Sequence, residues 1–182
     1  MGLGAGPPEK FGSRLLPNST ELPLSLIHIF ANAEENAANE IPGWKFQELR
    51  QQARDEWNDK LSHIDVQGGS EKSRRVFSTA LYHALLHPSV FSDANGEYIG
   101  FDDKIHHVEE GRLQYANFSG WDIYRCQVEL LAMLFPKQAS DIAESLVKDA
   151  EQGGGLPIWP VANDESSVMV GDPSDAILAR CV

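Results

Sequence analysis

Two long segments carry apolar residues at the spacing of one helical face, and this periodicity constrains the fold more than any other feature of the sequence. The segments are 70–87 and 136–150, in which apolar side chains recur at positions i, i+3 and i+4. Ser70 can cap the first helix, and a run of three glycines, 153–155, follows the second. Weaker stripes cross 44–61 and 121–135. The pattern predicts a mainly α fold with its chemistry in the loops.

Length, charge and cysteine content narrow the class of protein. A chain of 182 residues is long enough for one domain with a sizeable core. The formal net charge of −12 argues against nucleic acid or an anionic membrane as the partner. It gives no information about an uncharged substrate such as a sugar. No apolar run approaches the roughly 20 residues that span a bilayer, and no secretory signal is visible. Two cysteines are too few for a disulfide framework, and Cys126 is expected to be a buried thiol.

The two ends differ from the rest of the chain. Residues 1–23 have no periodicity, while 24–29 (LSLIHI) and 180–182 (RCV) match translations of a common transposase adapter and of its reverse complement. We therefore expect a leader at 1–29, non-native or unstructured, and an artefactual end at 180–182. The alternative for 24–29 is a short buried strand. Between these ends we expect a linker and connecting helix at 30–69 and a longer helical domain at 70–179.

The first candidate site is the stretch 155–174, GLPIWPVANDESSVMVGDPS. It places Asp164 and Glu165 within an apolar, aromatic and turn-forming sequence. Adjacent side chains on an extended loop point in opposite directions, so we expect one of the two to face a pocket. A carboxyl group desolvated beside Trp159, Pro160 and Met169 would favour its protonated form, as general-acid chemistry requires. The alternative is a solvated acidic loop.

The second candidate site is the stretch 117–125, NFSGWDIYR. Trp121 and Asp122 together suggest an aromatic platform for a sugar with an acceptor for its hydroxyls, and Arg125 could pair with Asp122. The alternative is a core tryptophan beside an aspartate that caps a helix. His83 and His87 are one helical turn apart but lack a third ligand nearby, so they predict no metal site. Trp44 and Trp57 are expected to be packing anchors.

With these residues described, the chain resembles glycoside hydrolase family 92, the calcium-dependent exo-acting α-mannosidases. The blocks that carry the resemblance are 40–66, 76–102, 118–136 and 153–174, and the last two are the most specific. The family fold is a β-sandwich followed by an (α/α)6 barrel. The resemblance thus implies that residues 70–179 are a partial (α/α)6 catalytic domain, the first part of the barrel, with most of the N-terminal β-sandwich domain missing.

The resemblance also implies roles for individual residues. Glu165 falls on the general acid of the family motif W-x-x-x-x-N-E-T, with Asp164 in place of Asn and Ser166 in place of Thr. Trp121 and Asp122 fall on the motif that lines the sugar subsite, and Asp164 is expected to bind substrate beside them. The catalytic base, an Asp in a G-N-D-D-like motif, and most calcium ligands are expected to lie outside this chain, so its metal ligands are unknown.

The function implied is removal of terminal α-linked mannose from glycans by an inverting hydrolase. The complete protein is expected to be secreted, periplasmic or at the cell surface, and the present chain alone is expected to be inactive. Two alternatives stay open: another (α/α)-barrel glycosidase, or a non-catalytic carbohydrate-binding or interaction fragment. The linkage preference and the oligomeric state are not implied by these motifs.

Overall fold

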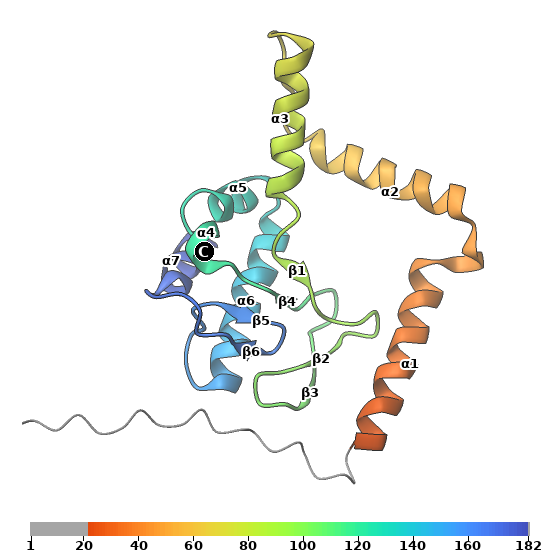
Figure 1. The fold of residues 1–182 in the computed structure, drawn as a ribbon, viewed down its shortest axis with the longest axis vertical. Coiled ribbons are helices and arrows are strands. Elements are labelled where there is room, and N and C mark those ends of the chain that lie inside the picture. Colours follow the sequence, from red (N-terminus) through yellow and green to blue (C-terminus); the bar gives the residue numbers. More distant parts are fainter. Residues whose placement is uncertain (1–21, 182) are drawn as a thin grey trace, which may run out of the picture.

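The computed structural model describes residues 22–181, with side chains described from Phe30 onward, and its order of elements is mainly helical (Figure 1). The helices are α1 (Leu22–Glu40), the 3₁₀ turn η1 (Pro42–Trp44), α2 (Phe46–Leu61), α3 (Glu71–Ala84), α4 (Gly120–Ile123), α5 (Gln127–Leu134), α6 (Pro136–Gly153) and α7 (Pro173–Cys181). The short strands are β1 (Ser89–Val90), β2 (Glu97–Ile99), β3 (Ile105–His107), β4 (Tyr115–Ala116), β5 (Pro160–Val161) and β6 (Asp164–Glu165).

The strands form three antiparallel pairs, β1 with β4, β2 with β3, and β5 with β6. Within residues 22–181, no helix is both long enough and apolar enough to cross a membrane. The fold is mainly helical, as the apolar periodicity predicts. The short strand pairs lie in the connections between helices.

The two strongest predicted helices begin and end at the residues that the sequence marks. The Ser70 side chain caps α3 by accepting a hydrogen bond from the Ser73 amide at 3.1 Å. Pro136 occupies the first turn of α6, where its missing N–H costs nothing. Gly154 ends α6 in the left-handed region, with φ 85°, as a residue without a Cβ can.

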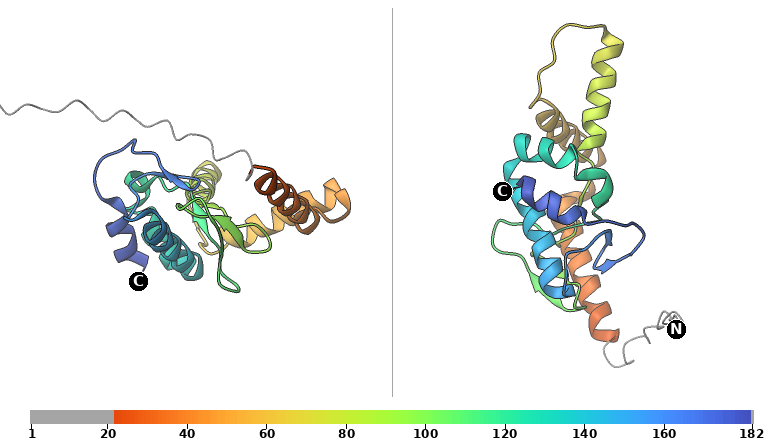
Figure 2. Two further views of the ribbon diagram at one scale, coloured as in Figure 1. Left: turned by 90° about the horizontal axis from the view of Figure 1, so that it is seen from below. Right: turned by 90° about the vertical axis from the view of Figure 1, so that its left-hand side faces the viewer.

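The buried core lies where α4, α5, α6 and α7 meet the strand β4. Leu146 and Ile177 are 0% exposed, so the centre of the core lies between α6 and α7. These two helices lie side by side in both views of Figure 2. The core residues are Tyr115, Phe118, Ile123, Val128, Leu131, Phe135, Ile142, Leu146 and Ile177. The aromatic stretch that precedes α4 is therefore anchored by its own Phe118.

Helices α2 and α3 extend away from this core (Figure 1). No described side chain of α2 is buried, and Leu81 is the buried residue of α3. The two helices meet through Trp57 and Tyr82, whose rings pack edge to face with centroids 4.5 Å apart. Trp57 thus packs as predicted. The same prediction is wrong for Trp44, which is 76% exposed because it lies in the turn between α1 and α2.

Helix α1 is held to the rest of the molecule by two asparagines one turn apart. Asn32 Nδ2 donates to carboxylate oxygens of Asp93 and Glu97, each at 2.8 Å. Asn36 Nδ2 donates to Asp93 at 2.7 Å, and its Oδ1 accepts from the Ala94 amide at 2.7 Å. We call this arrangement the asparagine clasp. It ties α1 to the turn that precedes β2.

The backbone of residues 22–29 forms the first part of helix α1, so residues 24–29 are not the short strand that was the alternative to a leader. A non-native leader at 1–29 stays a prediction. An adapter origin is a property of the nucleotide sequence and stays a prediction, and residues 1–21 and 182 lie outside the described part of the chain.

A stripe of polar side chains is buried along one face of α6. Asp141, Ser145 and Asp149 follow at intervals of four residues and are 1%, 1% and 4% exposed. Arg112 Nη1 donates to Asp141 at 2.9 Å, and Gln114 Nε2 donates to Asp149 at 3.1 Å. The Ser145 hydroxyl accepts from the Tyr115 amide at 2.9 Å. These hydrogen bonds join the polar stripe of α6 to residues 112–115, which lead into β4.

Two further expectations differ from the structure. The stripe predicted over 121–135 is two helices, α4 and α5, because the chain turns between Tyr124 and Cys126. Cys126 is exposed, so the prediction of a buried thiol is wrong, since this turn carries it out of the core. The last described element is α7, which extends as far as Cys181 and is joined to α5 by an ion pair between Arg180 and Glu129.

Candidate active site

The first candidate stretch forms a small hairpin between α6 and α7. Strands β5 and β6 pair with Pro160 opposite Glu165 and Val161 opposite Asp164. Ala162 and Asn163 form the two-residue turn between them. The Ser174 hydroxyl, buried at the start of α7, donates to the Pro157 carbonyl and closes the base of the loop. The hairpin therefore leaves the core after α6 and returns to it at the start of α7, close to where it left.

Asp164 and Glu165 point to opposite sides of this hairpin, as expected for adjacent residues on an extended strand. Asp164 is exposed, and its Oδ1 accepts from the Glu165 amide at 2.9 Å. Glu165 is half-buried. The two carboxylates therefore act as separate groups, and Glu165 is the one that faces inward.

The oxygens of Glu165 are held by backbone amides of its own loop. Oε1 accepts from Ser167 at 2.7 Å and from Trp159 at 3.2 Å. Oε2 accepts from Trp159 at 3.0 Å and also from Ile158. These donors belong to the backbone, whereas the sequence analysis expected apolar side chains around the carboxyl group. The role of Glu165 as an acid stays a prediction.

Three residues other than glycine adopt left-handed backbone angles in and beside the hairpin. They are Asn117, Ala162 and Ser167, with φ of 61°, 52° and 53°. Such angles are unfavourable for side chains with a Cβ, and they gather at ligand-binding and catalytic loops. The surrounding contacts must therefore hold this part of the chain in place.

The second candidate stretch places Trp121 and Asp122 on α4 at the surface. Trp121 is 48% exposed, and the Arg125 guanidinium lies over its ring with its carbon 5.9 Å from the centroid. Arg125 Nε donates to the Tyr124 hydroxyl at 2.8 Å, which replaces the predicted pairing with Asp122. Asp122 is exposed, and Ser119 rather than Asp122 is the N-cap of α4. Trp121 is thus not the core residue of the alternative interpretation.

The structure brings the two stretches together through Asn117 and Gly120. Asn117 Oδ1 accepts from the Ala162 amide at the tip of the hairpin, at 3.0 Å. Gly120 lies so close to the loop that a Cβ built on it would be 2.9 Å from the Ile158 carbonyl oxygen. Sequence analysis missed both contacts, because neither residue type signals a partner so distant in the sequence.

His87 is a further residue whose position the sequence did not predict. Its Nε2 accepts a hydrogen bond from the Ser119 amide at 3.1 Å, directly before α4. Burial lowers the pKa of the imidazole, and the Asp122 carboxylate partly opposes this shift. A neutral ring is the form that can accept this bond, so His87 supports the segment that carries Trp121 and Asp122.

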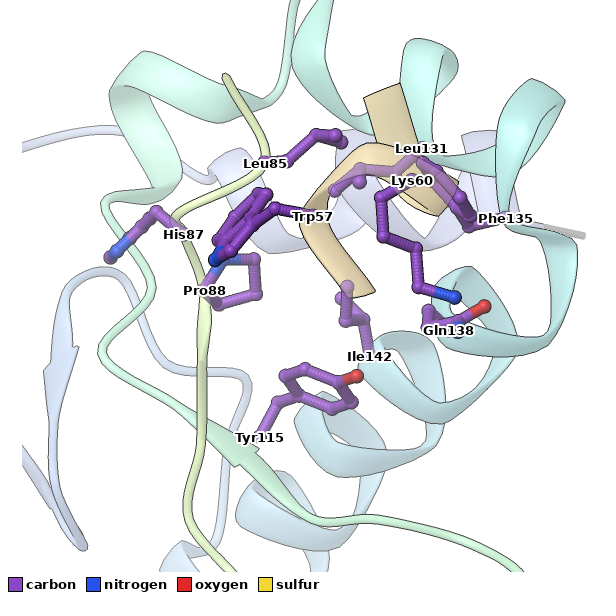
Figure 3. A pocket seen from close by; sticks show the side chains of 10 residues that line it. All are labelled: Trp57, Lys60, Leu85, His87, Pro88, Tyr115, Leu131, Phe135, Gln138 and Ile142. Atoms are coloured by element: carbon purple, nitrogen blue, oxygen red, sulfur yellow. The ribbon is translucent and has the colours of Figure 1, made fainter. Parts of the chain in front are cut away.

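An apolar cavity of about 230 Å³ lies beside this segment, between α2, α5 and α6 (Figure 3). It is lined by Trp57, Lys60, Leu85, His87, Pro88, Tyr115, Leu131, Phe135, Gln138 and Ile142. The ring of His87 points away from the centre of the cavity. None of the predicted site residues lines it, so this cavity is not the candidate site.

Metal-binding groups do not cluster in the described part of the chain. Among residues 22–181, no group of three or more His, Cys, Asp or Glu side chains could hold a metal ion. Which residues of the complete protein would hold calcium stays a prediction.

Comparison with known proteins shows the family of this chain. The model of the glycosyl hydrolase family 92 catalytic domain matches residues 32–182. The chain belongs to family 92. The Asp164-Glu165 hairpin and the Trp121-Asp122 segment both lie within the matched region, and the helical fold is part of the (α/α)6 barrel.

Solved structures of family 92 share the fold. An α-mannosidase of this family from Bacteroides thetaiotaomicron is 31% identical, with a TM-score of 0.77, and the match covers 82% of this chain and 20% of that protein. An inverting mannosidase of the family from the same organism is 25% identical, with a TM-score of 0.75, over 81% of this chain and 20% of that one. The chain thus spans about one fifth of their length.

A sequence relative is described as an uncharacterized secreted glycosidase from Arthroderma benhamiae. It is 34% identical over 65 residues, which cover 34% of this chain and 8% of that protein.

Proposed function

We propose that the complete protein containing this segment is an inverting α-mannosidase that removes terminal mannose from glycans, with Glu165 as its general acid. The observation that carries the proposal is the contact between the Glu165 hairpin and the Trp121-Asp122 segment in a chain of family 92. A mannosidase of the family from Bacteroides thetaiotaomicron, solved with mannoimidazole, supports the choice of sugar.

Trp121, Asp122 and Asp164 would contact the sugar. The half-exposed indole of Trp121 offers an apolar face to the C–H groups of a pyranose ring, and Arg125 restricts its orientation from one side. Asp122 and Asp164 are exposed carboxylates that can accept hydrogen bonds from sugar hydroxyls. These residues would bind and orient the sugar, while Glu165 would act on the leaving oxygen.

The hydrogen bonds from backbone amides to the Glu165 carboxylate limit how this residue can hold and donate a proton. Each carboxyl oxygen has two lone pairs, and both oxygens accept from two amides. The Trp159 amide is shared by the two oxygens, so a proton on either oxygen could replace one branch of this shared bond while Trp159 stays bonded to the other oxygen. We therefore propose that Glu165 can hold and deliver a proton without losing the amides of Ile158 and Ser167.

An inverting mechanism also needs a base that stands about 6.5–9.5 Å from the acid to leave room for water. We propose that this base, the calcium ligands and the residues that select the linkage lie in other parts of the complete protein. Calcium bound to sugar hydroxyls would help to distort the ring, a role that suits an oxygen-coordinating cation. We also propose that the complete protein is exported, in keeping with the relative described as secreted.

The experiment that tests Glu165 compares two leaving groups in the complete enzyme. We expect Glu165→Gln to slow cleavage of a mannose–mannose bond by roughly 10²–10⁴-fold, and cleavage of a dinitrophenyl α-mannoside far less, because that leaving group departs without a proton. Asp172→Asn, an exposed change in the same loop, is the matched control. Equal losses on both substrates would remove Glu165 from the acid role. Mannose binding by the wild type without any turnover would favour a carbohydrate-binding function.

A further inference from the structure

Asn117 connects the two halves of the candidate site through one hydrogen bond. Its Oδ1 accepts from the Ala162 amide at 3.0 Å, across 45 residues of sequence. Ala162 is the first residue of the β5–β6 turn, and its φ is 52°. Two-residue hairpin turns favour Gly, Asn or Asp at such positions, because a Cβ is unfavourable there. A contact from outside the hairpin therefore holds a turn that its own sequence does not favour.

The backbone on the other side of this bond is fixed by the core. Phe118, the next residue, is 1% exposed and belongs to the central apolar cluster. The following amide, that of Ser119, donates to His87. Asn117 itself has a φ of 61°, an angle that Asn tolerates better than most residues. Its side chain is thus presented from a rigid base.

The second turn residue, Asn163, secures the other flank of the hairpin. Its Nδ2 donates to the Gly100 carbonyl at 3.3 Å and to Asp103 Oδ1 at 3.2 Å, in the β2–β3 connection. Asn163 therefore ties the tip to a peripheral loop, whereas Asn117 ties it to the core beside Trp121. Of these two contacts, the Asn117 bond is the one that joins the hairpin to the segment of Trp121 and Asp122.

We propose that Asn117 is a positioning residue that holds the β5–β6 hairpin, and with it Glu165, at a fixed distance from Trp121 and Asp122. The assignment of these three residues to a sugar site rests on the proposed function. The hydrogen bond itself does not, and its test needs no sugar.

The test uses two substitutions of Asn117 in the 182-residue chain. Asn117→Gly keeps the left-handed backbone accessible but removes the acceptor, and Asn117→Asp keeps both the acceptor and a tolerance for this backbone angle. The readout is hydrogen exchange of the Ala162 amide measured by NMR. Each rate is expressed relative to the Leu146 amide in the same sample, so that a change in global stability cancels.

We expect Asn117→Gly to lower the relative protection of the Ala162 amide by about tenfold, and Asn117→Asp to retain it. The Ser167 amide, which donates to Glu165, should lose protection in the Gly variant as well. Unchanged protection of Ala162 in Asn117→Gly, or an equal loss in Asn117→Asp, would overturn the proposal.

A measurement on the wild-type chain keeps the proposal falsifiable if either variant does not fold. A scalar coupling across the hydrogen bond, from the Ala162 amide nitrogen to the Asn117 side-chain carbonyl carbon, is expected, and its absence in a well-resolved spectrum would contradict the proposal. The leaving-group experiment on Glu165 can fail while these results hold, and the reverse is also possible. The two proposals are therefore tested separately.

Discussion

The Ser119 amide donates to His87 Nε2 at 3.1 Å, and this bond joins the end of α3 to the start of α4. Burial lowers the pKa of His87 from its ordinary value of 6.5, although Asp122 opposes the shift. The unfolded chain therefore binds the proton more readily than the folded one. The contribution of His87 to stability is fully present above about pH 6.5 and is lost as the pH falls below it.

We predict that acidification releases the Ser119 amide, because a protonated Nε2 can no longer accept. The protection factor of this amide, which corrects for the intrinsic pH dependence of exchange, should fall between pH 7.5 and pH 5. His87→Gln offers a non-titrating acceptor and should abolish that dependence. His83→Gln, at an exposed position one turn away, should leave it intact. A flat profile in the wild type would refute the prediction.

Asp149 should make the chain less stable as the pH rises. Burial raises the pKa of this carboxyl group from 3.8 to about 7, and the hydrogen bond from Gln114 opposes the shift only partly. The folded state then binds more protons than the unfolded state, so the free energy of unfolding falls between about pH 4 and pH 7. A difference of about three pKa units corresponds to on the order of 4 kcal/mol.

We predict that Asp149→Asn removes this slope and melts at a higher temperature than the wild type at pH 8, because an amide has no charge to bury. Thermal melts at pH 5 and pH 8 measure the effect. Asp172→Asn, an exposed change of the same kind, should follow the wild type. A variant that is less stable than the wild type at pH 8 would show that the ionised form is well accommodated.

Gly120 should tolerate no side chain. A Cβ there would be 2.7 Å from Pro173 Cγ and 2.9 Å from the Ile158 carbonyl oxygen. We predict that Gly120→Ala costs about 1–3 kcal/mol of unfolding free energy in urea titrations, as overpacking does. Gly155→Ala is the matched control, because a Cβ at Gly155 meets no atom within 4 Å and should be neutral or slightly stabilising. Equal effects of the two changes would contradict this account.

The asparagine clasp should determine whether α1 stays docked. Asn36→Ala removes the acceptor for the Ala94 amide and a donor to Asp93. We predict that protection of the Ala94 amide falls roughly tenfold, in line with the net worth of one hydrogen bond. Asn39→Ala, an exposed asparagine on the same helix, should change nothing at Ala94. Loss of protection in both variants would indicate a general weakening of the helix.

The helices could be predicted because their signals are local. Apolar periodicity marks α3 and α6, Ser70 marks a start, and Gly154 marks an end. That Asp164 and Glu165 point to opposite sides of an extended strand also follows from local alternation, although alternation does not say which of them turns outward. These features depend on neighbours within one or two turns, and such neighbours are visible in the sequence.

The contacts that assemble the candidate site could not be predicted in the same way. Asn117 and Ala162 are 45 residues apart, and Ser119 and His87 are 32 apart. No periodic pattern encodes such a pairing, because it depends on how helices pack. The exposure of Trp44 and Cys126 was missed for a related reason, since apolar character predicts burial only where the chain does not turn outward.

The bond from Ser174 to the Pro157 carbonyl closes the candidate loop at its base, where α7 begins in the core. The two helices on either side of the loop are thereby joined without the help of its outer residues. Changes between Val168 and Gly171, where most side chains are exposed, can therefore alter the outer surface of the loop at little expense to folding. The hairpin is in this sense a separate insert on the helical frame, attached at its base rather than built into the core.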